Sequence, residues 1–186
     1  MGCSVFCTTD SRSSRMKAVI SLLTTLLLIS CASFSGSDLK PGESELADIL
    51  HEMGEPAMRW QEPDGSRQLA YPRGMYTFMV WIAPDGRLVK IENVMNMKTF
   101  KRIRPGMNRD DVLHILGPSL SSGTAYFSAR DELALEWSYC DDWNEPARFD
   151  VLFDGSKGTV RSTLSLTESQ MGLCGDDGRC ICGHAK

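Results

Sequence analysis

Residues 103–118 decide the fold, and they read Ile103-Arg-Pro-Gly-Met-Asn-Arg-Asp-Asp-Val-Leu-His-Ile-Leu-Gly-Pro118. This stretch predicts a short amphipathic helix between two chain reversals. Asn108 is a favoured N-cap, and the apolar side chains from Val112 onward recur at the spacing of one helix face. Gly117 and Pro118 end the helix, because glycine accepts the left-handed conformation and proline cannot continue the helix. A helix this short is marginal alone in water, so its apolar face must pack on strands elsewhere.

The same stretch occurs earlier in the chain. Residues 48–54 read Asp-Ile-Leu-His-Glu-Met-Gly, and they match residues 111–117, Asp-Val-Leu-His-Ile-Leu-Gly, at a constant offset. A repeat of this length indicates two small tandem units rather than the stacked turns of a solenoid.

Strand-like segments follow each copy of the helix. Residues 75–82 are apolar on both faces of a period-two pattern, which predicts a strand covered on one side by the helix and on the other by the second unit or a partner. The remaining expected strands lie at 68–71, 87–92, 133–139, 148–153 and 159–166. A brief helix is expected at 98–104 and a Ser/Gly-rich loop at 119–124. The sequence therefore predicts an α+β fold of two tandem units, over residues 39–96 and 97–166. Each unit has one or two short helices packed on a three-stranded antiparallel sheet.

The beginning of the chain has the pattern of an export signal. Residues 18–29 form an uncharged apolar run after several basic residues, too short to span a bilayer but as long as the core of a signal peptide. We expect a signal peptide over residues 1–30, with Met16 as an alternative start. Leu28-Ile-Ser-Cys31 resembles the bacterial lipobox, which implies cleavage before Cys31 and a lipid anchor on its sulfur. Ala32 then implies, by similarity to the lipoprotein sorting rule, the periplasmic face of the outer membrane. Residues 31–38 are small and polar, as in a tether.

Composition and motifs argue against catalysis and nucleic-acid binding. The net charge is −4, and no basic patch suggests nucleic acid. His51 and His114 occupy equivalent positions in the two helices, and we expect them at the helix surface or half-buried. No Ser or Cys nucleophile stands in a recognisable setting, and no glycine-rich phosphate loop occurs. We expect a non-enzyme without a cofactor or a metal.

Three segments carry a resemblance to a known family. They are residues 100–119, Trp137-Ser-Tyr139 and Phe149-Asp-Val-Leu-Phe-Asp-Gly155. Together they resemble the SmpA/OmlA (BamE-like) family of outer-membrane lipoproteins, over roughly residues 39–166. The chain departs from the family in having Gly117-Pro118 where Gly-x-Pro is common, and Glu43 where Met is usual. The resemblance implies a lipid-anchored, non-catalytic accessory of envelope and outer-membrane β-barrel assembly, with a protein partner in the assembly machinery. A tandem pair of such units is also similar to the β-lactamase inhibitory protein, which implies as the alternative a periplasmic binding or inhibitor module.

Four cysteines follow the predicted anchor, namely Cys140, Cys174, Cys180 and Cys182. An even number in an oxidising compartment predicts disulfides, with three possible pairings. We favour Cys140 with Cys174, which would attach the Gly- and Cys-rich tail over 167–186 to the sheet. Cys180 and Cys182 would then form a local bridge or a free pair. A zinc site of Cys174, Cys180, Cys182 and His184 is the less favoured alternative, because the spacing is unusual and zinc needs thiolates.

Large apolar side chains are candidate contacts with a partner, although we expect most of them in the core. These residues are Trp60, Met79, Trp81 and Trp143.

Overall fold

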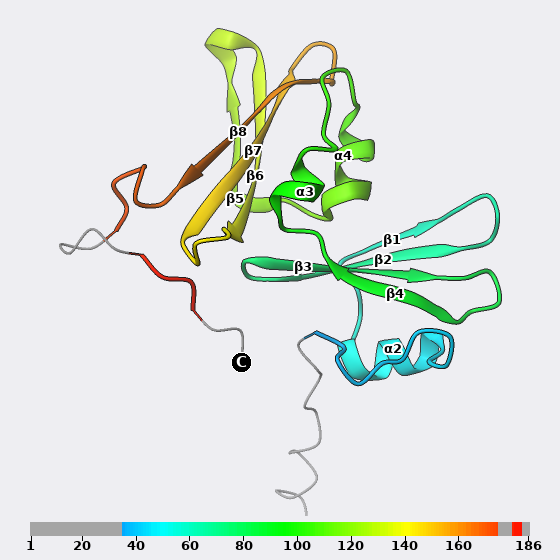
Figure 1. Ribbon diagram of the computed structural model, residues 1–186. Coiled ribbons are helices and arrows are strands. Elements are labelled where there is room, and N and C mark those ends of the chain that lie inside the picture. Colours follow the sequence, from blue (N-terminus) through cyan, green and yellow to red (C-terminus); the bar gives the residue numbers. More distant parts are fainter. Residues whose placement is uncertain (1–34, 175–179, 184–186) are drawn as a thin grey trace, which may run out of the picture. The chain divides into compact units, whose positions relative to one another are not determined.

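The computed structural model describes residues 35–174 and 180–183 (Figure 1). The chain divides into Met1–Ala32 and Ser33–Lys186, and the description below concerns the second part. The expected signal peptide, the expected lipidation residue Cys31 and residues 31–34 of the tether lie outside the described residues.

None of the described helices is long and apolar enough to cross a bilayer.

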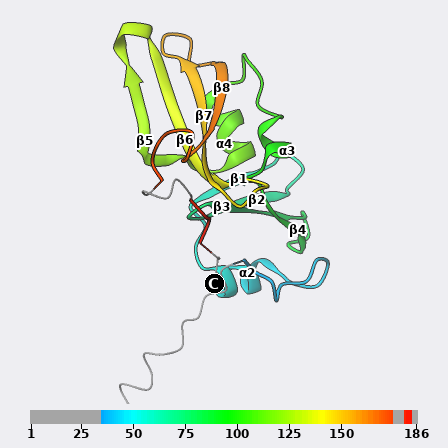
Figure 2. The ribbon, with the colours of Figure 1, turned by 60° about the vertical axis from the view of Figure 1, so that its left-hand side comes forward.

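Two antiparallel sheets of four strands make up the α+β architecture, and each sheet follows chain order. The first sheet follows the helix α2 (Leu46–Met53) and contains the strands β1 (Met58–Gln61), β2 (Arg67–Arg73), β3 (Tyr76–Ile82) and β4 (Leu88–Asn93). Two helices, α3 (Met97–Phe100) and α4 (Arg109–Leu116), precede the second sheet. Its strands are β5 (Leu120–Phe127), β6 (Glu132–Cys140), β7 (Pro146–Asp154) and β8 (Val160–Thr167), with a short 3₁₀ turn η2 (Ser128–Arg130) between β5 and β6. Figures 1 and 2 show α4 between the two sheets.

The prediction of three-stranded sheets is wrong, because each sheet has a further edge strand. These strands are β1, which pairs with β2, and β5, which pairs with β6. Most of the expected loop at 119–124 belongs to β5, although its Ser/Gly-rich sequence has low strand propensity. Its register shifts between Leu120 and Ala125, so pairs with β6 on either side of residues 121–124, rather than local preference, keep this segment in the strand.

The helices α2 and α4 share their local geometry. The backbone N–H of Glu45 donates to Asp48 at 2.8 Å, and that of Asn108 donates to Asp111 at 3.1 Å, so each helix begins with a carboxylate bonded to its N-cap. Each N-cap residue also forms an isolated β-bridge just before the last strand of its sheet, Glu45 with Arg87 and Asn108 with Thr159. Each helix therefore begins beside the start of the fourth strand.

Strand β3 is covered on both faces, as its sequence pattern predicts. Val80 and Ile82 lie in a core cluster with Ile49 and Met53 of α2. On the opposite face, Met79 joins a second cluster that includes the helix α4 and the second sheet. The first sheet therefore lies between α2 and the second half of the chain.

Gly117 joins the two sheets at the end of α4. Its φ of +77° is in the region that favours glycine, and its carbonyl oxygen accepts a hydrogen bond from the Trp137 indole at 3.2 Å. A Cβ at this position would lie 2.9 Å from Thr77 Cγ2 and 3.3 Å from Ala70 Cβ. The close approach of α4 to β2 and β3 thus requires a residue without a side chain.

Gly54 provides a matched control for this contact, because it ends α2 with φ +76° but has nothing within 4 Å of a built Cβ. We expect Gly54→Ala to cost about 1–3 kcal/mol of unfolding free energy from backbone strain. Gly117→Ala should cost about 1–3 kcal/mol more, from overpacking against Thr77 and Ala70. Urea unfolding of both variants measures the difference, and equal losses would contradict the close approach.

Candidate functional site

The two equivalent histidines have different surroundings. The His51 side chain is 86% exposed and approaches only Glu52, at 3.7 Å, among the described charged groups. His114 is 36% exposed, stacks on Trp60 with ring centroids 5.1 Å apart and lies 3.0 Å from Glu62. Its backbone oxygen accepts a hydrogen bond from Gln68 at 2.6 Å. His114 thus connects α4 to the first sheet, and its described contacts are those of a packing residue.

The cysteine pairing differs from the favoured prediction. Cys140 pairs with Cys182 and Cys174 pairs with Cys180, with Cα atoms 6.0 Å and 5.3 Å apart. The expected bridge between Cys180 and Cys182 is wrong because an extended chain holds two such Cα atoms about 7 Å apart, at the limit for a disulfide. The favoured bridge from Cys140 to Cys174 is also wrong, because Cys140 is bonded to Cys182 and Cys174 is bonded to Cys180. The tail is still attached to the second sheet, through Cys182.

The alternative zinc site loses its thiolates in this arrangement. Cys174, Cys180 and Cys182 are all bonded to sulfur, and His184 lies outside the described residues. No cluster of three or more His, Cys, Asp or Glu side chains that could hold a metal occurs within residues 35–174 and 180–183.

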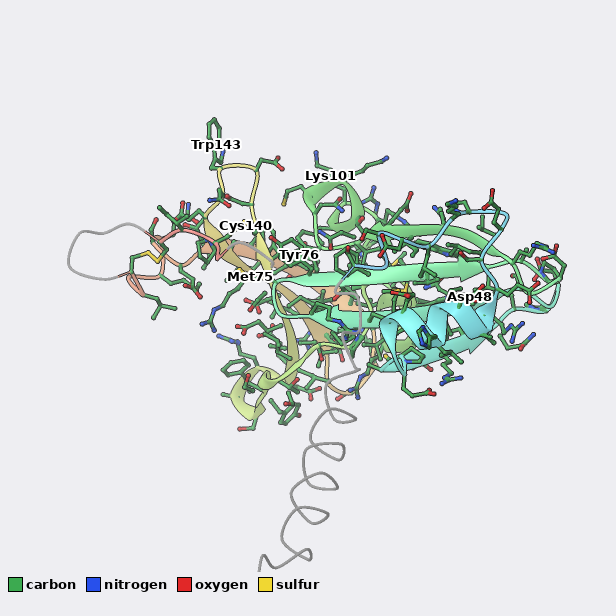
Figure 3. The ribbon with its side chains drawn as sticks, turned by 90° about the horizontal axis from the view of Figure 1, so that it is seen from below. Asp48, Met75, Tyr76, Lys101, Cys140 and Trp143 are labelled. Carbon is green, nitrogen blue, oxygen red and sulfur yellow. A yellow bond between two sulfur atoms is a disulfide. The ribbon has the colours of Figure 1, made fainter. Side chains whose placement is uncertain are left out.

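The four candidate contact residues separate into core and surface. Met79 is fully buried, while Trp60 and Trp81 are partly buried and pack against the shared core. Lys90 lies over the Trp81 ring at 4.2 Å. Trp143 is 88% exposed and stands clear of the body in Figure 3. Of these four, Trp143 alone is available to a partner.

The turn that carries Trp143, residues 141–145 between β6 and β7, is held in one conformation. The Asp141 carboxylate accepts hydrogen bonds from the backbone N–H groups of Trp143 at 2.9 Å and Glu145 at 2.8 Å. Asn144 has a φ of +61°, and its carbonyl accepts from the backbone N–H of Cys182 at 3.0 Å. The disulfide from Cys140 to Cys182 closes the base of the turn. Trp143 is thus an exposed aromatic side chain on a rigid support.

Four exposed basic residues form a cluster, and one of them, Lys101, points to the same side of the molecule as Trp143 in Figure 3. The members of the cluster are Lys98, Lys101, Arg102 and Arg104, within and just after α3. None of them forms an ion pair with a carboxylate in the described part of the chain. The net charge of the whole chain, −4, does not reveal this local cluster.

The opposite end of β6 carries a cluster that we call the aromatic end and define by Tyr126, Phe127, Leu133 and Phe153. Tyr126 and Phe127 are exposed, whereas Leu133 is partly buried and Phe153 is buried. Tyr126 is 58% exposed, and its hydroxyl donates to Asp131 at 2.6 Å. Asp131 also accepts from the backbone N–H of Ser156 at 3.0 Å. The hydrogen bond from the Ser156 hydroxyl, followed by those from Tyr126 and the Ser156 backbone, lowers the pKa of Asp131, and the hydrogen bond to this carboxylate raises the pKa of Tyr126.

A cavity of about 310 Å³ opens at the aromatic end. Its wall is mainly apolar, and it is lined by Arg109, Tyr126, Leu133, Phe153, Asp154, Gly155 and Gly158. A volume of this size is at the lower end of the range for ligand pockets, and it suits a single large side chain of a partner.

The outer face of the second sheet carries a charge network. Arg148 lies 3.2 Å from Glu136 and 3.7 Å from Glu168. Burial raises the pKa of the neighbouring Asp150, the Glu136 carboxylate raises it further, and Arg148 opposes both.

Neither a family model nor a curated protein matches the chain. Among solved structures, the chain is similar to an extracellular protein containing a SCP domain from Bacillus anthracis strain Ames, at 11% identity and a TM-score of 0.28. The match covers 74% of this chain, which spans 46% of the length of that protein. A TM-score this low indicates neither a fold nor a function.

The two disulfides should differ in their contribution to stability. Cys140 and Cys182 are separated by 42 positions and Cys174 and Cys180 by 6, so the first closes a much longer loop in the unfolded chain. Replacing the first pair by serine should cost about 4 kcal/mol and replacing the second about 2 kcal/mol. Urea unfolding measures both losses, and peptide mapping of the oxidised protein checks the pairing. Equal losses would contradict the loop argument.

Asp150→Asn should stabilise the protein at neutral pH. Because the pKa of Asp150 is raised in the folded state, the folded protein binds a proton at this carboxylate more tightly than the unfolded chain does. The carboxylate therefore costs stability as the pH rises above its ordinary range, near 4. We expect a higher melting temperature than wild type at pH 7 and no gain at pH 3. The exposed Asp38→Asn is the control, and a gain at pH 3 equal to that at pH 7 would exclude this explanation.

Proposed function

We propose that this chain is a lipid-anchored accessory of the outer membrane, non-catalytic and facing the periplasm, that acts in envelope and β-barrel protein assembly. The anchor would be Cys31, and the soluble body would consist of two BamE-like units over residues 39–96 and 97–166. The observation that carries this proposal is the shared geometry of α2 and α4.

The shared geometry supports the duplication in three ways. Both helices begin with the same bond between N-cap and carboxylate, both end at a glycine with φ near +77°, and both N-caps form a bridge at the same place in their sheets. Such agreement between two segments far apart in the chain is the pattern of a repeated unit. The resemblance to the SmpA/OmlA family rests on residues 100–119, which include α4, and on residues 137–139 and 149–155.

The chemistry of the described residues favours docking rather than catalysis. His51 is isolated at the surface and His114 packs against Trp60, so neither is placed as a general base with a nucleophile within reach. The two disulfides are suited to an oxidising compartment such as the periplasm.

The aromatic end is the surface that we propose for the partner in the assembly machinery. Tyr126, Leu133 and Phe153 line a cavity, and the hydrogen bond to Asp131 holds Tyr126 in place, so a partner would meet a pre-organised pocket. The same cavity favours the alternative function, a periplasmic binding or inhibitor module that receives a side chain of its target.

Capture of the full-length tagged chain from its own outer membranes, followed by mass spectrometry, tests the proposal. We expect subunits of the β-barrel assembly machinery to be enriched, and Cys31→Ala to abolish the enrichment by releasing the chain from the membrane. Tyr126→Ala should reduce the enrichment about tenfold if the aromatic end is a hot spot, while the exposed Leu164→Ala should not. Enrichment of one abundant unrelated protein in place of the assembly subunits would overturn the assembly role and favour the inhibitor.

A further inference from the structure

The helix α3 is connected to the β6–β7 turn through aromatic residues of the two strands. Phe100 of α3 stacks on Phe149 with centroids 4.0 Å apart and meets Tyr139 edge-on at 4.9 Å. The Tyr139 hydroxyl also donates to the Met97 sulfur at 3.8 Å. Tyr139 immediately precedes Cys140 and the turn, so α3 packs on the strand ends from which the turn projects. In Figure 3, Lys101 and Trp143 point to the same side of the molecule.

This side of the molecule carries exposed apolar side chains and two regions of opposite charge. We call it the dipolar surface and define it by Met97, Ile181, the basic cluster from Lys98 to Arg104 and the turn over 141–145. Met97 is exposed, and Ile181 is 71% exposed. The backbone N–H of Cys182 donates a hydrogen bond to the carbonyl oxygen of Asn144. Ile181 directly precedes Cys182, and Trp143 directly precedes Asn144.

The acidic side chains of the turn and the basic cluster form no ion pairs with each other among the described residues. The turn contributes the acidic residues Asp141, Asp142 and Glu145, and α3 with the residues just after it contributes the four basic residues. The hydrogen bonds of Asp141 and Glu145 go to backbone N–H groups of the turn and of Ser169, which leaves their charge available to a partner.

We infer that the partner of the dipolar surface is a second copy of this chain. A two-fold axis through the centre of the surface places the acidic turn of one copy on the basic α3 of the other, and the reverse contact forms at the same time. A purely basic or purely acidic partner would satisfy one region and repel the other. Trp143 lies within the contact and packs along the basic side chains of the partner copy, an arrangement that favours cation–π interaction.

The inference is independent of the proposed assembly role, because the aromatic end lies at the other end of β6. A dimer built in this way leaves both copies of the aromatic end open. The expected affinity is modest, because one tryptophan, a few short apolar side chains and exposed ion pairs form a small interface.

Exchange of one charge between the two regions tests the symmetry directly. Two full-length copies with different tags are extracted separately from cells in mild detergent and mixed, one tag is captured, and the recovery of the other is measured. Lys101→Glu paired with itself sets acid against acid at both contacts, and Asp142→Lys paired with itself sets base against base. We expect recovery of each matched pair to fall about tenfold or more. The mixed pair, Lys101→Glu with Asp142→Lys, has opposite charges at both contacts and should recover to near the wild-type level.

Trp143→Ala in both copies should also reduce recovery about tenfold or more, while Leu164→Ala, an exposed apolar change on β8, should leave it unchanged. All these positions are exposed, and melting curves check that each variant folds. No recovery in the wild type would overturn the inference and leave the surface to a different protein. A dimer that survives Trp143→Ala, or a mixed pair no better than the matched pairs, would place the contact on another face and overturn it equally.

Discussion

The absence of a side chain at Gly117 is the constraint on which the arrangement of the two sheets depends. Because α4 ends there, its last turn can lie directly on Thr77 and Ala70, and the freed carbonyl reaches the Trp137 indole. This approach brings the apolar face of α4 onto the face of the first sheet that α2 does not cover. One core cluster then includes residues of both sheets, so neither half presents an open apolar face at the junction.

The two copies of the helix have the same geometry but different roles. Gly54 has the backbone angles of Gly117, yet nothing lies near it, and His51 projects to solvent where His114 stacks on Trp60. The difference follows from position, because α4 has a sheet on both sides and α2 covers only one. Residues that are equivalent in sequence therefore have different mutational tolerance, which depends on what each helix touches and not on the repeat itself.

Local patterns predicted the elements whose preferences agree with their packing. The helix at 109–116 has a cap, an apolar face and a stop signal, and residues 76–82 alternate on two buried faces, so both follow from the sequence. The strand β5 does not, since it is held by β6 rather than by its own composition. The disulfide pairing also escaped sequence reasoning, because it depends on how the tail returns to the β6–β7 turn. Trp143 was one of four equal candidates until burial separated them.

The short tail stabilises the β6–β7 turn through Cys182. A turn of five residues with an exposed tryptophan would ordinarily be mobile, and ordering it on binding would cost affinity. Here Asp141 binds two backbone N–H groups from inside the turn, while Cys182 holds it from outside through a disulfide and a hydrogen bond to Asn144. The entropy of the turn is thus lost on folding and oxidation, before any partner arrives. The turn and the residues that hold it all lie in the second half of the chain and its tail. The surface that Trp143 presents therefore depends on that half and not on the first sheet.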